Sequence, residues 1–319
     1  MVMKDIPKND IVSEINILKK EKNAIILAHY YQTGDIQDIA DFVGDSLALS
    51  QKAAANYADI ILFAGVKFMA ETAKILSPSK KVLLPDMEAG CSLADSCNEA
   101  DFRKFIEDNK GRTVITYVNT NTEIKALSDI VCTSSNAVRI VESLPPGEKI
   151  IFGPDRNLGN YILNQTGRDI LVWDGACHVH EEFSLEAILD LKEKNPDAKI
   201  IVHPECELPV RMTADFIGST SALLKFTKTD SANKYIVGTE PGIIHQMKRE
   251  SPSKIFIPAP PRDSTCGCSE CNFMKLITIE KIHKCLVEEK PEIIIEEKIL
   301  LKAVKPIRRM LEISEKLGL

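Results

Sequence analysis

Short, β-branched apolar segments alternate along the chain with longer segments whose apolar residues recur at helical spacing. The short segments are bounded by glycine, proline, aspartate or serine, which indicates strands. We expect strands at 24–31, 59–65, 81–86, 113–119, 129–135, 149–155, 170–175, 199–205, 215–221, 234–240 and 254–260. Nearly continuous apolar strands that alternate with helices are typical of parallel sheets covered on both faces. The pattern therefore predicts an α/β fold.

The expected strands also recur as a set. Similar segments begin at 58, 128 and 214 (ADIILFAG, SDIVCTSS and ADFIGSTS), and each is followed by a helical segment and a strand that starts with lysine. Three divergent copies of one unit explain this order better than one long sheet, although so short a match also recurs by chance. We predict three pseudo-symmetric three-layer α/β/α lobes with parallel sheets, at 1–95, 96–180 and 181–275. A helical tail, 276–319, is expected to pack across the lobes.

Composition and charge narrow the function classes. The chain has 319 residues, 44% of them hydrophobic, and a formal net charge of -6, which argues against nucleic acid or an anionic membrane as main partner. The N-terminal segment lacks the apolar core of a signal peptide, and no segment approaches the roughly 20 apolar residues of a membrane span. We therefore expect a cytoplasmic protein. Its nine cysteines are then core residues, metal ligands or reactive thiols rather than disulfides.

Polar residues collect where the expected strands end. Ligands of open parallel sheets bind beyond the carboxyl ends of the strands, so this is where a site is expected. Three strands end in polar pairs two residues apart, which places both side chains on one face: His29 and Tyr31, Tyr117 and Asn119, and His203 and Glu205. Histidine, tyrosine and glutamate supply acid/base groups, although a histidine at a strand end is more often a hydrogen-bonded structural residue.

Serine and threonine begin several expected helices. Ser46, Ser134, Ser219 and Thr220 stand at such starts, where hydroxyl and backbone N–H groups can bind an anion. The same residues are common as ordinary N-caps. The motif Cys-His-Val-His adds His178 and His180 near the end of the second copy.

One cysteine position follows the last strand of each of the three copies. These positions are Cys91, Cys177 and a group formed by Cys266, Cys268 and Cys271. One cysteine per lobe would converge on a central axis, and three thiolates without a fourth suit a [4Fe-4S] cluster with one open iron. The alternative is a local metal clip made of the clustered cysteines with Cys285, for which a structural zinc would need four ligands.

The motifs together resemble the quinolinate synthase family over roughly residues 20–285. They are LAHYYQ, VGDSLALS, ADIILFAGVKFMAETAKIL, LLPDMEAGCSLAD, TYVNT, DIVCTSSNAV, WDGACHVH, VHPEC, GSTSAL and VGTEPGIIH followed by CNFMKLITIEK. The resemblance implies three α/β/α lobes around a central [4Fe-4S] cluster bound by Cys91, Cys177 and Cys271. It implies a transferase that condenses iminoaspartate with dihydroxyacetone phosphate to quinolinate, releasing phosphate and two waters, for NAD biosynthesis. It leaves open a partner enzyme that supplies iminoaspartate.

The resemblance also implies roles for individual residues. The catalytic residues would be His29, Tyr31, Tyr117, His203 and Glu205. The substrate would be bound by His29, Ser46, Tyr117, Asn119, Ser134, His180, His203, Glu205, Ser219 and Thr220. The open iron would act as a Lewis acid. Many family members carry Cys-x2-Cys-x2-Cys where this chain has Cys266-x-Cys268-x2-Cys271, and we predict that Cys271 is the ligand because it stands at the start of a helix.

Two other functions share parts of this pattern. A diphthamide-synthesis-type radical enzyme also has three lobes and three cysteines, but it cleaves S-adenosylmethionine, and HYYQ, YVN and HPEC disfavour it. A non-catalytic metal or redox sensor would need the cysteines but not His29, Tyr31 or Glu205. Alanine substitutions of those three residues separate a sensor from an enzyme.

Overall fold

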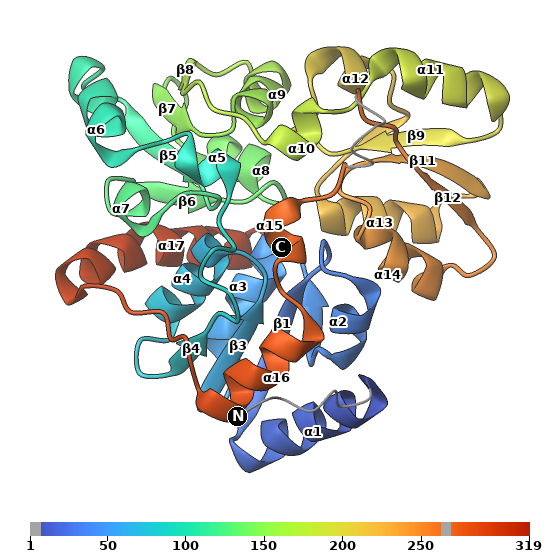
Figure 1. Cartoon of the computed structure of the whole chain (residues 1–319). Coiled ribbons are helices and arrows are strands. Elements are labelled where there is room, and N and C mark those ends of the chain that lie inside the picture. Colours follow the sequence, from blue (N-terminus) through green and yellow to red (C-terminus); the bar gives the residue numbers. More distant parts are fainter. Residues whose placement is uncertain (1–7, 263–268) are drawn as a thin grey trace. The chain divides into compact units, whose positions relative to one another are not determined.

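The computed structural model describes residues 8–262 and 269–319, and it divides into two compact units. The first unit comprises Met1–Gly90 and Asn272–Glu296, and the second comprises Cys91–Cys271 and Glu297–Leu319. Three parallel sheets of four strands, flanked by helices, form the framework of these units (Figure 1). This confirms the α/β fold expected from the alternation of apolar strands and helices.

The first unit contains one of the three sheets, here called sheet 1. Its strand order is β2-β1-β3-β4. The strands are β1 (Ala24–His29), β2 (Phe42–Gly44), β3 (Ile60–Ala64) and β4 (Lys81–Leu83). The helices are α1 (Lys8–Glu21), α2 (Gly34–Ile39), α3 (Ser46–Ala55), α4 (Lys67–Leu76), α15 (Asn272–Lys275) and α16 (Ile279–Glu288). Helix α16 comes from the predicted tail, and it packs against α1 and β3.

The second unit contains sheet 2, with order β6-β5-β7-β8, and sheet 3, with order β10-β9-β11-β12. Sheet 2 consists of β5 (Thr113–Tyr117), β6 (Ile130–Cys132), β7 (Ile150–Gly153) and β8 (Ile170–Val172). Sheet 3 consists of β9 (Lys199–Val202), β10 (Phe216–Ile217), β11 (Lys234–Gly238) and β12 (Ile255–Pro258). Each sheet falls within one of the predicted lobes, whose boundaries stay predictions.

Eleven helices accompany sheets 2 and 3 in the described part of the second unit. They are α5 (Ser92–Asp95), α6 (Glu99–Asp108), α7 (Thr122–Lys125), α8 (Ala137–Ser143), α9 (Arg156–Thr166), α10 (His178–Glu181), α11 (Leu185–Lys194), α12 (Leu208–Met212), α13 (Thr220–Thr229), α14 (Ile243–Glu250) and α17 (Glu297–Lys316). Helix α17 packs against α7, α8 and β6. The two helices of the predicted tail, α16 and α17, therefore belong to different units.

The central strands are buried on both faces, which explains their continuous apolar sequences. Every residue of the central strands β3 and β7 is buried. On one face of sheet 2, Phe102 of α6 packs edge-on against Trp173, with their ring centroids 5.4 Å apart. On sheet 3, Ile188 of α11 packs into a cluster with Ile200 and Val202 of β9. No helix in the described ranges is long and apolar enough to cross a membrane.

The strand orders correct our alignment of the first copy by one strand. The segment ADIILFAG forms β3, which is equivalent to β7 and β11, whereas SDIVCTSS and ADFIGSTS form β6 and β10. Their counterpart is β2, within ADFVGDS at 40–46, a strand missing from our prediction. Strand β2 has only three residues, two of them half-buried, so its apolar signal is weaker than that of the fully buried β3. The strand at Lys81 is accordingly the counterpart of β8 and β12.

A repeated aspartate contact supports the corrected alignment. In each sheet an aspartate just before the short edge strand accepts the backbone N–H of the central strand through its carboxylate. It also donates its own N–H to the carbonyl of the same residue. The pairs are Asp41 with Ile26 at 2.7 Å, Asp129 with Val114 at 2.8 Å and Asp215 with Ile200 at 2.8 Å. The same two bonds occur fifteen residues apart in sequence each time, which chance similarity would not produce.

Candidate functional site

Three side chains of the second unit meet at the carboxyl ends of β5 and β9. Tyr117 is the last residue of β5, and Glu205 lies in the turn after β9. The Tyr117 hydroxyl donates to Glu205 Oε1 at 2.5 Å, and His180 Nδ1 lies 3.1 Å from Glu205 Oε2. All three side chains are buried, so the contacts are shielded from water and stronger than surface contacts.

The environment of Glu205 keeps its carboxylate ionised. Burial alone would raise the pKa of Glu205, but the imidazoles of His180 and His203 and the hydroxyl of Tyr117 outweigh it. Together they lower the pKa of Glu205 to about 2. Glu205 is therefore a buried anion with hydrogen-bond donors around it, a suitable group for orienting those donors or binding a cationic centre.

Backbone contacts set the tautomer of His203. The N–H of Glu205 donates to His203 Nδ1 at 3.3 Å, so the ring proton resides on Nε2. His203 Nε2 then donates to Ser134 Oγ, 3.1 Å away. In the first unit the N–H of Tyr31 donates to His29 Nδ1 at 3.2 Å in the same way. The His29/Tyr31 and His203/Glu205 pairs therefore share a local geometry in which Nδ1 accepts a backbone N–H and leaves Nε2 for other partners.

Three partly exposed cysteines lie in the same unit as these residues. Cys91 precedes α5, Cys177 precedes α10 and Cys271 precedes α15. The loops of the first two are joined directly, because Ser92 Oγ and His178 Nδ1 are 2.7 Å apart. The four other described cysteines, Cys97, Cys132, Cys206 and Cys285, are buried, as expected of core residues.

The three thiols influence each other's ionisation. Burial raises the pKa of Cys91 to about 12, and the nearby Cys271 adds to the shift. Burial also raises the pKa of Cys177 well above its usual value, with contributions from Glu205, Cys91 and Cys271. Thiolates so close together are unfavourable without a cation, and a metal that replaces their protons would relieve this.

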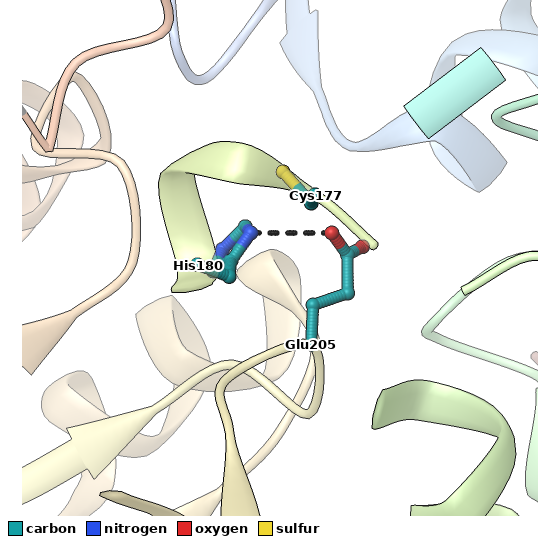
Figure 2. A group of neighbouring side chains, drawn as sticks. All are labelled: Cys177, His180 and Glu205. Carbon is teal, nitrogen blue, oxygen red and sulfur yellow. Dashed lines mark ion pairs between the residues drawn. The ribbon is translucent and has the colours of Figure 1, made fainter. Parts of the chain in front are cut away.

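The donor set fits an iron–sulfur cluster. Three mutually close thiols are the ligands such a cluster uses, and they would leave one iron without a protein ligand. Cys177, His180 and Glu205 also offer ligand atoms within 4.8 Å of one another (Figure 2), a grouping that could hold a single metal ion. The clip alternative depends on Cys266 and Cys268, which lie outside the described residues. Its proposed fourth ligand, Cys285, is buried in α16.

The predicted anion-binding residues have mixed roles. Ser219 is an ordinary N-cap in one respect, because its Oγ accepts the N–H of Ala222 at the start of α13, at 3.3 Å. Thr220 is buried beside it, and Ser134 bonds His203. The Oδ1 atom of Asn119 is buried and accepts no hydrogen bond from the part of the chain that the structure describes. A buried acceptor without a donor is costly, which favours a ligand there.

The predicted residues of the first unit lie at the carboxyl ends of β1 and β2. His29 is buried at the end of β1, with the Tyr31 ring edge-on to it at a centroid distance of 4.5 Å. Ser46 is the first residue of α3, whose N-cap is Asp45. Asp45, rather than Ser46, therefore accepts the N–H of Ala48, and the Ser46 hydroxyl is not the N-cap acceptor.

Sequence reasoning missed three buried polar residues. Thr239 Oγ1 lies 3.0 Å from His180 Nε2, and Asp155 and Glu240 have no exposed surface. All three follow the carboxyl ends of β7 or β11. The rule that located His203 and Glu205, that sites form beyond the carboxyl ends of parallel strands, applies equally to these three residues.

Comparison with known proteins gives one consistent family. The sequence model of a family described as quinolinate synthetase A protein matches residues 13–312. The quinolinate synthase of Thermosynechococcus vestitus is 58% identical over 305 residues, which cover 96% of both chains. The quinolinate synthase of a Synechocystis species is also 58% identical over 305 residues, and that of a Synechococcus species is 57% identical over 310 residues, 97% of both chains.

Proposed function

The chain belongs to the quinolinate synthetase A family, and we propose that it condenses iminoaspartate with dihydroxyacetone phosphate to quinolinate for NAD biosynthesis. The observation that carries this proposal is the buried group of Tyr117, Glu205 and His180 in the same unit as three mutually close thiols. Forming an aromatic ring from two small carboxylated or phosphorylated molecules requires repeated proton transfers and loss of water. This group supplies acid and base side chains for those steps.

Cys91, Cys177 and Cys271 would hold a [4Fe-4S] cluster with one open iron. When bound, the cluster would supply a Lewis acid that polarises a substrate oxygen or nitrogen. The chain's own contribution is to fix the three cysteine loops. One such constraint joins two of the loops, the Ser92–His178 contact.

The acid and base residues are assigned from their hydrogen bonds. The Tyr117 hydroxyl donates to Glu205 Oε1 at 2.5 Å, so the Glu205 carboxylate would orient that hydroxyl for proton exchange with the substrate. His180 connects Glu205 to Thr239 and stabilises the carboxylate. His203 presents Nε2–H toward Ser134, ready to donate a proton or to bind a substrate oxygen. By family resemblance, His29 and Tyr31 would also move protons.

Substrate anions would bind to hydroxyl and amide groups at the strand ends. Ser134, Ser219 and Thr220 offer hydroxyls, and the ten-residue helix α13 offers backbone N–H groups at its start. Asn119 offers an amide whose Oδ1 is buried. Ser46 would contribute from the first unit by family resemblance. We further propose that the enzyme works in the cytoplasm, where thiols stay reduced, and that another enzyme supplies iminoaspartate.

Anaerobic reconstitution tests the proposal. The chain is loaded with iron and sulfide, and quinolinate is measured after addition of dihydroxyacetone phosphate and freshly generated iminoaspartate. We expect about four irons per chain and quinolinate formation without S-adenosylmethionine, both lost on exposure to air, as follows from an open cluster iron. Quinolinate formation at the full rate without iron, or zinc as the only bound metal, would contradict the proposal.

A further inference from the structure

Two buried carboxylates occupy equivalent positions in sheets 2 and 3. Asp155 is the second residue after β7, and Glu240 is the second residue after β11. The equivalence follows from register, because Gly153 and Gly238 end the two strands and pair with the corresponding ends of β5 and β9. Neither carboxylate has any exposed surface, and neither has a role in the function proposed above.

Each carboxylate accepts the backbone N–H of a proposed cluster ligand. Asp155 Oδ2 accepts the N–H of Cys177 at 3.0 Å, and Glu240 Oε1 accepts the N–H of Cys271 at 3.4 Å. The second oxygen of each anchors the turn that carries it. Asp155 Oδ1 accepts from Leu158 at 2.8 Å, and Glu240 Oε2 accepts from Gly242 at 2.7 Å. Each carboxylate thus ties a cysteine backbone to a strand end.

The two cysteine loops differ in their other attachments. The N–H of Arg156 donates to the carbonyl of Gly175, at 2.7 Å, and the Arg156 side chain pairs with Asp174 and Glu181 on either side of Cys177. Pro241 occupies the place of Arg156 in sheet 3 and has no N–H to donate. Sheet 3 therefore lacks an equivalent of the backbone hydrogen bond that Arg156 makes to Gly175 in sheet 2.

Sheet 1 has the backbone attachment without the carboxylate. Its equivalent residue is Val66, which offers no side-chain acceptor, and the following N–H, of Lys67, donates to the carbonyl of Ala89 at 2.7 Å. Sheet 1 thus has this backbone bond but no carboxylate, sheet 2 has both bonds, and sheet 3 has the carboxylate without this backbone bond. A purely structural need for a buried acid at this turn would apply to all three sheets.

We propose that Asp155 and Glu240 are positioning residues that hold the backbones of Cys177 and Cys271 so that their sulfurs face the cluster site. The identity of the bound group rests on the proposed function, whereas the hold on the two backbones does not. A buried hydrogen bond fixes the position of a backbone group firmly, because neither partner can exchange the bond for one to water. Partners that orient a metal ligand typically change metal affinity about 10–100-fold when removed.

The first test measures hydrogen exchange in the cluster-free protein. Asp155→Asn replaces one of the two acceptor oxygens with an NH2 group, which cannot accept a hydrogen bond. One of the two N–H bonds to residue 155 is therefore lost. We expect peptides that contain Cys177 to exchange about tenfold faster or more in Asp155→Asn, with Cys271 unaffected, and the reverse in Glu240→Gln. The matched controls are Asp129→Asn and Asp215→Asn. They alter carboxylates that also accept a backbone N–H but lie at the opposite edge of sheets 2 and 3.

The second test measures the cluster itself. After anaerobic reconstitution, release of iron to a chelator should be about 10–100-fold faster in Asp155→Asn and Glu240→Gln than in the parent chain and both controls. Circular dichroism shows whether each variant is folded. Unchanged exchange at both cysteines, or equal release from variants and controls, would overturn the positioning role. A parent chain that binds no iron would instead refute the proposed function, and the exchange experiment would still decide the role of the two carboxylates.

Discussion

In sheet 2 the central strand ends at Tyr117 and Asn119 follows two residues later, whereas the equivalent positions of sheet 3 hold His203 and Glu205. The scaffold around these positions is the same, with one strand order and one aspartate contact to the central strand. Only Glu205 carries a negative charge, and its hydroxyl partner, Tyr117, comes from the other sheet. Likewise His203 of sheet 3 bonds Ser134 of sheet 2.

The comparison indicates that the repeat supplies geometry and that side-chain differences supply chemistry. A carboxylate at Asn119 as well as at Glu205 would add a further acidic group among the buried carboxyl groups and thiols, which raises the pKa of its neighbours. With one carboxylate, one amide, one phenol and one imidazole, each position has a different protonation behaviour. Divergence at equivalent positions is thus a physical requirement for placing acid and base groups in one site.

Sheets 2 and 3 are each followed by one proposed cluster ligand, Cys177 or Cys271. Removing either cysteine should have the largest effect on iron binding. Cys177→Ser and Cys271→Ser should each abolish iron binding after anaerobic reconstitution, because each removes one of only three proposed thiolate ligands. Cys97→Ser changes a buried cysteine and serves as control. Cys266→Ser and Cys268→Ser, outside the described residues, are predicted to retain the cluster. Full iron content in Cys271→Ser would refute the ligand assignment.

The largest chemical difference between the equivalent positions of the two sheets is the carboxylate of Glu205, and its removal should strongly reduce turnover. Glu205→Gln keeps the side-chain shape but removes the charge, and turnover should fall by about 10²–10⁴-fold while iron content is unchanged. Tyr117→Phe, which removes the hydroxyl that bonds Glu205, should have an effect in the same range. The exposed Glu186→Gln is the control. Steady-state rates close to the parent in both variants would remove Tyr117 and Glu205 from the proton-transfer steps.

The same carboxylate predicts a pH dependence of stability. The pKa of Glu205 is lowered from 4.5 to about 2 on folding, so its ionised form contributes about 3 kcal/mol above pH 4.5. This contribution should decrease as the pH falls from 4.5 toward 2, because the carboxylate then takes up a proton. Urea unfolding of the cluster-free chain should show the free-energy gap between parent and Glu205→Gln shrinking on acidification. A constant gap from pH 7 to 3 would contradict the lowered pKa.

The sequence predicted the long buried strands and the polar pairs at their ends, because apolar continuity and spacing of two residues are local signals. It did not predict β2, whose three residues are only partly buried and depend on pairing with β1 for their structure. Nor did it predict the contacts of Asp155 and Glu240, although both residues stand just beyond strand ends. Their contacts join residues 22 and 31 positions apart, and such pairings follow from the fold rather than from any local pattern.

Substitutions of the proposed substrate-binding residues in sheets 2 and 3 should have smaller effects than those of Glu205 or the cysteines. Asn119→Ala and Ser219→Ala each remove one group proposed to bind a substrate anion, and the Michaelis constant should rise about tenfold, the cost of one hydrogen bond to a charged group. Ser219→Ala should also destabilise the chain slightly through loss of an N-cap, whereas Asn119→Ala should not. Unchanged kinetics in Ser219→Ala would leave that residue only its N-cap role.

The smallest effect is expected where the sheets are most alike, at the aspartates that bond the central strands. Asp129→Ala and Asp215→Ala each remove one hydrogen bond to a backbone N–H, and each should lower the free energy of unfolding by about 1 kcal/mol. Because both side chains lie at the amino ends of the strands, iron content and turnover should not change. Equal losses in urea unfolding would support one shared structural role for the repeat. A loss confined to one variant, or a change in turnover, would show that the two contacts are not equivalent.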